Sequence, residues 1–168
     1  MSTLRRLALS SFVTGLVVAL DQLTKAAARV YLARRPPISL CGGVVRLVYS
    51  ENVGAFLGLG AALRPTARVL IFGVFSGLLL IGVIVHLVTA RGLARFDVIA
   101  ASLLVAGGLG NLIDRALHDG RVTDFVSLGI GPLRTGIFNV ADVAIVAGVG
   151  WLLVSSVARG RESRQGRQ

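Results

Sequence analysis

The sequence is poor in charged residues, aromatic residues and cysteine. Charged residues make up 15% of the 168 residues and aromatic residues 6%, whereas 54% are apolar and the mean hydropathy is +0.79. Soluble domains carry about 25% charged residues, so this chain has too few to cover a surface that faces water. The composition excludes an ordinary soluble enzyme and a disordered chain, and the length allows a single domain, residues 1–168. We therefore predict an α-helical integral membrane protein.

The single cysteine and the two histidines exclude several kinds of catalytic site. Cys41 cannot form an internal disulfide or a cysteine-rich metal site. Since no histidine lies near it in the sequence, we expect a buried small apolar residue and not a nucleophile. His86 and His118 are 32 residues apart without a His-Glu-x-x-His motif, and no Gly-x-Ser-x-Gly elbow is present. We therefore expect no metal and no cofactor. Carboxylate chemistry remains, in which two aspartates that share a proton activate a water molecule.

The net charge of +10 does not by itself indicate a nucleic-acid-binding protein. Most of the basic residues flank long apolar runs, where they would face lipid headgroups. They are not interleaved with aromatic residues, so no surface for base stacking is visible. We expect membrane lipids as partners and no nucleic acid.

Four apolar runs are long enough, or nearly so, to cross a bilayer, which needs about 20 helical residues. We predict four transmembrane helices at approximately 7–28, 69–90, 98–114 and 137–158. The first run could instead be a cleaved signal peptide. Asp21 and Lys25, however, stand where a cleavage site needs small uncharged residues, so a retained helix is favoured.

An even number of helices places both termini on one side of the membrane. Arginines are denser in the termini and in the segment between the second and third runs than in the two longer loops, 21–68 and 114–136. The positive-inside rule then predicts cytoplasmic termini and places both longer loops outside.

The two outer loops contain patterns typical of short strands. Residues 38–40 and 44–50 are rich in β-branched residues and are separated by two glycines, which predicts a hairpin, and residues 121–126 predict another strand. Gly54–Leu63 is apolar but too short to span, so we predict an interfacial helix there. A small extracytoplasmic β-sheet on four transmembrane helices is the expected fold.

Polar residues recur at helical spacing near the outer ends of three runs. Asn139 and Asp142 are three residues apart, with Asp142 about two turns into the last run, and Asp21 and Lys25 are four apart. Asn111 is three residues before Asp114 and four before Arg115. Such pairs can be helix caps or surface ion pairs. Together they predict a polar pocket at the outer leaflet, because an aspartate within an apolar run normally faces the bundle interior.

Glycines in two of the runs favour close helix packing. The Gly107-Gly-Leu-Gly110 segment lacks the Lys-Ser/Thr that a phosphate loop needs, and Gly73 and Gly77 form a Gly-x-x-x-Gly pair. We expect neighbouring helices to approach at both places.

Five motifs, in this order, make the chain similar to lipoprotein signal peptidases (signal peptidase II), which are bacterial inner-membrane aspartyl proteases. They are Asp21-Gln-Leu-Thr-Lys25, Asn52-Val-Gly-Ala-Phe56, Gly107-Gly-Leu-Gly-Asn-Leu-Ile-Asp-Arg115, Val122-Thr-Asp-Phe125 and Phe138-Asn-Val-Ala-Asp142. The second motif has one alanine fewer than is common in the family. Each motif alone is weak, but the resemblance covers nearly the whole chain.

The resemblance implies specific roles for residues of these motifs. The two catalytic aspartates of the family correspond to Asp124 and Asp142; spacing alone left Asp114 and Asp119 as alternatives to Asp124. We assign Asp114 to bracing the pocket. The other matching positions imply binding of substrate or bracing of the site, and they are Asp21, Lys25, Asn52, Gly54, Gly108, Asn111, Arg115, Asn139 and Ala141.

The implied substrate is a prolipoprotein whose cysteine carries diacylglycerol, cleaved just before that cysteine to release the signal peptide. The implied location is the bacterial cytoplasmic (inner) membrane. There we expect a multi-pass monomer with both termini cytoplasmic and the active site toward the outer leaflet. Two other functions remain open from the residues alone. One is a small proton-coupled transporter that uses Asp142, and the other is a membrane scaffold whose polar pairs associate helices.

Overall fold

The computed structural model describes residues 1–54, 64, 67, 69–90 and 92–165. Helices predominate. They are α1 (Thr3–Tyr31), the π-helical η3 (Val69–Phe75) followed by α3 (Ser76–Thr89), α4 (Arg95–Leu117) and α5 (Val140–Gln165). A four-stranded antiparallel sheet with the order β1-β2-β3-β4 consists of β1 (Ile38–Leu40), β2 (Val45–Asn52), β3 (Val122–Ile130) and β4 (Leu133–Arg134).

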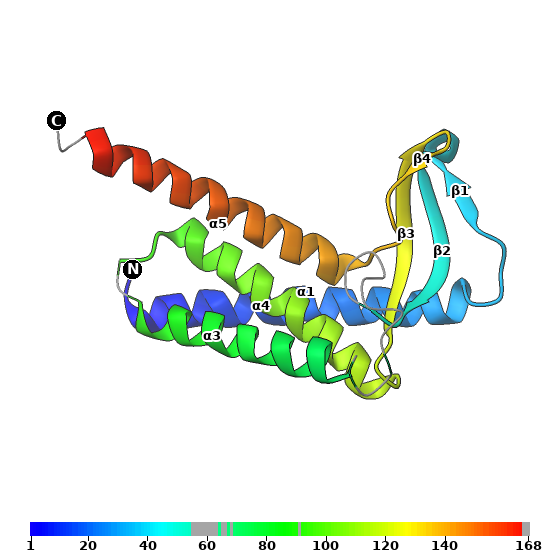
Figure 1. Cartoon of the computed structure of the whole chain (residues 1–168), viewed down its shortest axis with the longest axis horizontal. Helices are drawn as coiled ribbons and strands as arrows, with labels where there is room; N and C mark the ends of the chain where they lie inside the picture. The colour runs from blue at the N-terminus through cyan, green and yellow to red at the C-terminus, as the bar shows by residue number, and fades with distance from the viewer. Residues whose placement is uncertain (55–63, 65–66, 68, 91, 166–168) are drawn as a thin grey trace.

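The sheet lies at one end of the helices, and the two termini lie at the other. The start of α1 and the end of α5 are close to the same end of the bundle, while β2 and β3 stand across the opposite end (Figure 1). α4 packs against α1, α3 and α5 and so forms the centre of the bundle. The polar ends of α1, α4 and α5 therefore meet the sheet.

The helices are apolar enough for a membrane. Among the described residues, α1, α4 and the segment Val140–Arg161 are long and apolar enough to cross a bilayer, and Gly73–Thr89 is a shorter apolar helix. Large apolar side chains such as Phe12, Leu78 and Leu153 point outward. The core between helices consists largely of small side chains, as expected where lipid surrounds the bundle.

Glycines allow α4 and α5 to approach closely. A Cβ at Gly107 would lie 2.3 Å from the carbonyl oxygen of Ala141, and one at Gly148 would lie 2.5 Å from that of Ala100. Close packing around Gly107 is thus confirmed. At Gly73 and Gly77 no such approach occurs among the described residues, since a Cβ at either position would meet none of them within 4 Å.

The predicted hairpin and the additional strand are both present. β1 and β2 are joined by the 3-10 turn η1 (Cys41–Gly43), in which Gly42 adopts a φ of 65° that favours glycine. β2 also pairs with β3, where Ser50 lies opposite Asp124, and the register shifts between Leu47 and Ser50. Cys41, which we expected to be buried as a small apolar residue, is exposed. The predicted interfacial helix, Gly54–Leu63, lies outside the described residues except for Gly54.

Candidate active site

A short backbone pairing joins β3 to the start of α5. Phe138 N donates to Val126 O (2.8 Å), and Phe138 O accepts from Val126 N (2.9 Å). The helix begins two residues later, at Val140. This pairing brings the strand that carries Asp124 beside the first turn of α5, which carries Asp142.

Asn139 and Asp142 form a reciprocal cap at the start of α5. Asp142 N donates to Asn139 Oδ1 (2.9 Å), and Asn139 N donates to Asp142 Oδ2 (3.2 Å). This arrangement satisfies two backbone donors that a helix start leaves free. The prediction that Asp142 lies about two turns into the helix is therefore wrong. Asp142 lies in the first turn, because the cap starts the helix after Asn139.

Asparagine side chains hold the carboxylates of Asp124 and Asp142. Asn139 Nδ2 donates to Asp124 Oδ1 (2.7 Å), and Asn52 Nδ2 donates to Asp124 Oδ2 (3.0 Å). Asn111 Nδ2 donates to Asp142 Oδ1 (3.0 Å). Asn139 contacts both aspartates, through its side chain and its backbone N–H respectively. The structure thus brings both aspartates into one hydrogen-bonded network.

The environment of Asp124 favours its protonated form. Burial raises its pKa from 3.8 to about 6, and the nearby carboxylate of Asp142 contributes in the same direction. The amide donors of Asn52 and Asn139 oppose the rise. A carboxyl group with such a pKa can give and take a proton near neutral pH, as acid–base catalysis requires.

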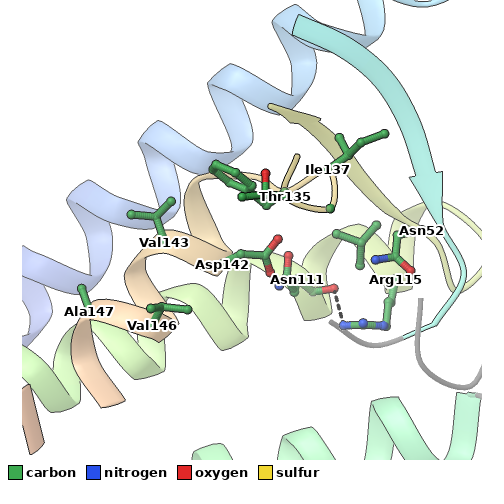
Figure 2. Close-up of a pocket in the computed structure, with 12 residues that line it drawn as sticks. Asn52, Asn111, Arg115, Thr135, Ile137, Asp142, Val143, Val146 and Ala147 are labelled. Carbon is green, nitrogen blue, oxygen red and sulfur yellow. Dashed lines mark hydrogen bonds between the residues drawn. The ribbon is translucent and has the colours of Figure 1, made fainter. Parts of the chain in front are cut away.

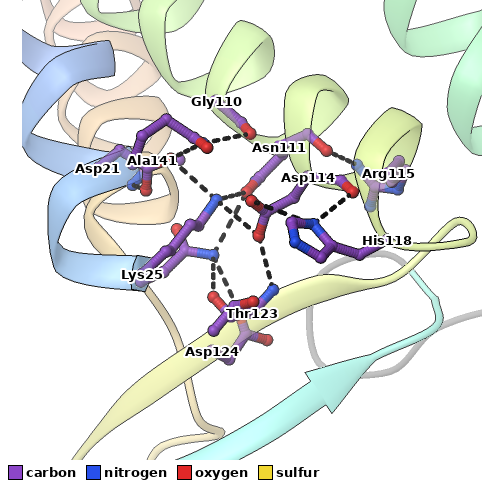
Figure 3. Close-up of polar contacts among 12 residues, drawn as sticks. Asp21, Lys25, Gly110, Asn111, Asp114, Arg115, His118, Thr123, Asp124 and Ala141 are labelled. Atoms are coloured by element: carbon purple, nitrogen blue, oxygen red, sulfur yellow. Dashed lines mark hydrogen bonds and ion pairs between the residues drawn. The ribbon is translucent and has the colours of Figure 1, made fainter. Parts of the chain in front are cut away.

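A buried lysine holds the next layer of the site together (Figure 3). Lys25 is fully buried, and its Nζ lies 2.9 Å from Asp21 Oδ2, 3.4 Å from Asp114 Oδ2 and 3.0 Å from Asn111 Oδ1. Its single positive charge faces two carboxylates and so balances half of their negative charge. Through Asn111, the same lysine orients the amide that donates to Asp142.

Asp21 connects this layer to the backbone of α5. Its Oδ1 accepts from Ala141 N (2.9 Å), one residue before Asp142. Gly110 makes the contact possible, since a Cβ there would lie 2.5 Å from Asp21 Oδ2. Ala141 is itself completely buried. Asp21 therefore fixes the helix turn on which Asp142 stands.

Arg115 connects α4 to the loop after β2. Its NH2 donates to Gly54 O (3.1 Å) and its NH1 to Asn111 O (3.3 Å). Gly54 N in turn donates to Asn52 Oδ1 (2.9 Å), and Asn52 is the residue that binds Asp124. Gly108 lies away from this network, where a Cβ would meet the side chain of Leu80 on α3.

Two further residues belong to the network although sequence reasoning did not include them. Arg29 NH1 lies 2.7 Å from Thr123 Oγ1 and 3.6 Å from Asp114 Oδ1. Thr123 N donates to Asp114 Oδ2 (2.8 Å), so Asp114 anchors β3 just before Asp124. Arg29 follows Lys25 by four residues, as Lys25 follows Asp21. That spacing places Asp21, Lys25 and Arg29 on one helix face, so it could have identified Arg29 as a member of the network.

The network borders a pocket of about 430 Å³ (Figure 2). Asn52, Asn111, Arg115 and Asp142 form its polar part. Apolar residues continue it along α5, and they include Val143, Val146 and Ala147. The pocket therefore offers a polar end that includes the carboxylate of Asp142 and an apolar extension along α5. In the part of the chain that the structure describes, no group of three or more His, Cys, Asp or Glu residues is arranged to hold a metal.

Comparisons with known proteins agree with these features. The sequence profile of the Signal peptidase (SPase) II family matches residues 13–158. A lipoprotein signal peptidase of Moorella thermoacetica is 36% identical over 151 residues, which cover 88% of this chain and 94% of the relative. One of Brevibacillus brevis is 32% identical and covers 90% of this chain and 97% of the relative.

Solved structures also match this fold. One, described as a bacterial membrane enzyme, superimposes with a TM-score of 0.79 and 28% identity over 89% of this chain and 87% of that chain. Another with the same description has a TM-score of 0.74 and 26% identity. The match of the family profile to most of the sequence, with relatives above 30% identity, shows that this chain belongs to the signal peptidase II family.

Proposed function

We propose that this protein is an aspartic endopeptidase that removes the signal peptide from diacylglyceryl-modified bacterial prolipoproteins, cleaving before the lipidated cysteine. Membership of the signal peptidase II family supports this activity. The observation that carries the mechanism is the meeting of Asp124 and Asp142 in one network of asparagine donors beside a pocket. The alternative of a proton-coupled transporter is not supported, since the relatives are named lipoprotein signal peptidases.

The two aspartates divide the proton transfers. Asp142, which accepts from Asn111 and from Asn139 N in the first turn of α5, is the ionised partner in the proposed mechanism. Asp124, with its raised pKa, holds the proton. Water attacks the scissile carbonyl carbon and gives a proton to Asp142, while Asp124 protonates the carbonyl oxygen.

Collapse of the tetrahedral intermediate completes the cycle. The C–N bond breaks, and the leaving nitrogen takes the proton from Asp142. Asp124 recovers its proton from the hydroxyl group that becomes the new carboxyl. The products are the signal peptide with a new carboxyl terminus and a lipoprotein whose first residue is the lipidated cysteine. No covalent enzyme intermediate is needed.

The shape of the pocket suits a lipidated substrate. Its apolar part along α5, including Val143 and Val146, can take an acyl chain, while Arg115 and Asn111 face the peptide. Binding energy from the lipid then positions the scissile bond against the carboxylates. Residues beyond Asp124 and Asp142 thus hold the substrate or brace the site.

We place the protein in the bacterial cytoplasmic membrane as a monomer with four spans, cytoplasmic termini and the sheet outside. The position of the termini opposite the sheet supports this topology (Figure 1). The sole cysteine, Cys41, is exposed on the sheet side, in the turn between β1 and β2. A membrane-impermeant maleimide should label it in intact cells. Arg161→Cys in a Cys41→Ala background should be labelled only after lysis, and the reverse pattern would refute this orientation.

The activity is tested with the purified full chain and two synthetic peptides of identical sequence, with and without diacylglycerol on the cysteine. Mass spectrometry should show one cut, directly before the cysteine, and only in the lipidated peptide. Equal cleavage of both peptides would contradict the lipid-dependent positioning. A lack of cleavage of either peptide by a folded protein would refute the proposed function.

A further inference from the structure

A second cavity lies at the end of the bundle that holds the termini. It has a volume of about 440 Å³ and lies between α3, α4 and α5. Leu79, Gly82 and Val83 of α3, Ala101 of α4 and Leu152 of α5 form its apolar walls. The proposed peptidase reaction takes place at the opposite end and does not use this cavity.

A polar group of side chains borders the cavity. Asp97, almost completely buried, accepts from Trp151 Nε1 (3.1 Å), Ser155 Oγ (2.7 Å) and Arg159 NH1 (2.6 Å). His86 and Arg159 also line the cavity. The side chain of Arg159 is 57% exposed, so part of its guanidinium remains open to a ligand after the contact with Asp97. Asp97 thus holds the arginine at the mouth of an apolar cavity.

The surroundings of this mouth are basic. Arg5, Arg95 and Arg161 are exposed near the same ends of α1, α4 and α5. An apolar cavity with arginines at its mouth matches a molecule that has an acyl chain and a negative headgroup. The guanidinium of Arg159 suits a phosphate, because it presents several donors in one plane.

We propose that this cavity is a binding site for an anionic phospholipid, with an acyl chain between α3, α4 and α5 and the phosphate on Arg159. The charge of the site selects anionic over zwitterionic lipids. The site is separate from the substrate pocket, so it binds a lipid of the membrane and not the lipid of the prolipoprotein.

The single tryptophan of the chain provides a direct probe. Trp151 donates to Asp97, a wall residue of the cavity, and therefore lies beside the proposed lipid. The full chain is reconstituted in phosphatidylcholine vesicles, and brominated phosphatidylglycerol or brominated phosphatidylcholine is added. Bromine quenches tryptophan fluorescence at short range. Half-maximal quenching should need an about fivefold lower fraction of the anionic lipid. This is the gain expected when one arginine lies beside a headgroup of net negative charge, which phosphatidylcholine lacks.

Two glycines on α3 provide matched variants. A Cβ at Gly82 or at Gly77 meets no described residue within 4 Å, but only Gly82 lines the cavity. Gly82→Leu should fill the cavity and abolish the preference for the anionic lipid, whereas Gly77→Leu should keep it. Arg159→Gln should also abolish the preference while leaving quenching by phosphatidylcholine unchanged. Far-UV circular dichroism of the two glycine variants in phosphatidylcholine vesicles, compared with that of the unchanged protein, shows that they fold.

Two results would overturn the proposal. One is equal quenching of the unchanged protein by both brominated lipids. The other is a full anionic preference in folded Gly82→Leu protein, which would place the lipid elsewhere on the surface. Because the probe reports binding and not cleavage, failure of the peptidase assay leaves this test intact.

Discussion

Both ends of the bundle contain buried aspartates, but their partners differ. At the end with the termini, Asp97 accepts from the guanidinium of Arg159 as well as from Trp151 and Ser155. At the sheet end, Asp124 accepts from the neutral amides of Asn52 and Asn139, and no ion pair with it occurs among the described residues. A cation in direct contact holds a carboxylate ionised, whereas neutral amides leave its proton exchangeable. Asp97 is therefore held as an ionised structural partner, whereas Asp124 can exchange a proton.

The cation at the sheet end is placed one layer away from the reactive pair. Lys25 contacts Asp21 and Asp114 directly, but it reaches Asp142 only through the amide of Asn111. The site thus obtains the structural benefit of an ion-pair cluster without a direct cation on either proposed catalytic aspartate. Four predictions test this contrast.

The largest effect is expected from the proposed catalytic pair. Asp124→Asn and Asp142→Asn keep the volume but remove one proton transfer each, so either should lower turnover by about 10³-fold or more. The double variant should be only slightly slower than the singles, because the residues act as a unit. Turnover of the lipidated peptide and its binding, which should survive, are measured separately.

Asp97→Asn provides the matched control for this pair. It makes the same chemical change in a buried aspartate at the other end of the bundle. Its turnover should stay close to that of the unchanged protein. Retention of more than about a tenth of the activity in Asp124→Asn or Asp142→Asn would contradict their assignment as a catalytic pair.

The second prediction concerns the buried cation. Lys25→Met leaves Asp21 and Asp114 buried without their shared positive charge, which should lower the free energy of unfolding by about 3–5 kcal/mol. Denaturant unfolding in detergent measures this change. Arg121→Met removes the exposed ion pair with Glu51 and should cost less than about 1 kcal/mol. Similar losses in both variants would show that burial of the Lys25 cluster is unimportant.

The third prediction tests the two hydrogen bonds that the guanidinium of Arg115 donates to backbone carbonyl groups. Lysine keeps the charge but cannot reach both Gly54 O and Asn111 O in the same way, so Arg115→Lys should lower kcat about tenfold with little change in unfolding. Arg121→Lys, on the exposed surface, is the control and should be neutral. Unchanged kcat in a folded Arg115→Lys protein would remove Arg115 from the set of positioning residues.

Local sequence patterns predicted the elements well, because hydropathy and strand propensity act within each segment. The apolar helices, the hairpin of β1 and β2 and the strand β3 follow from runs of residues alone. Spacing also indicated that Asp21 and Lys25 share a helix face. Their actual contact at 2.9 Å agrees with that spacing.

Features that depend on contacts between distant segments could not be predicted in the same way. The depth of Asp142 depends on where Asn139 caps α5, which involves the pairing of Phe138 with β3. Asp97 meets Arg159 only because α4 and α5 pack together, although they are far apart in sequence. Whether a described helix packs against Gly73 likewise depends on contacts between distant segments. Helical periodicity identifies the residues that share one face of a helix, but not the segment that packs against that face.

The smallest expected effect is a shift in the pH profile of the peptidase. Asp124 must hold a proton in the proposed mechanism and has a pKa of about 6, so kcat/KM should fall as the pH rises above that value. Since this pKa exceeds the ordinary 3.8, Asp124 also contributes stability that is fully present below pH 3.8 and is lost as the pH rises to about 6.

Asn52 allows the origin of this alkaline limb to be tested. Its amide donates to Asp124 Oδ2 and stabilises the ionised form, so Asn52→Ala should raise the pKa of Asp124 and move the limb up by about one pH unit. Glu51→Gln changes the neighbouring residue, whose side chain instead binds Arg121 and Tyr49, and should leave the limb in place. An alkaline limb that moves equally in both variants would reflect the general charge of the sheet surface. An alkaline limb that moves only in Asn52→Ala would assign the titrating proton to Asp124. This carboxyl group has amide donors, whereas Asp97 is in contact with the guanidinium of Arg159.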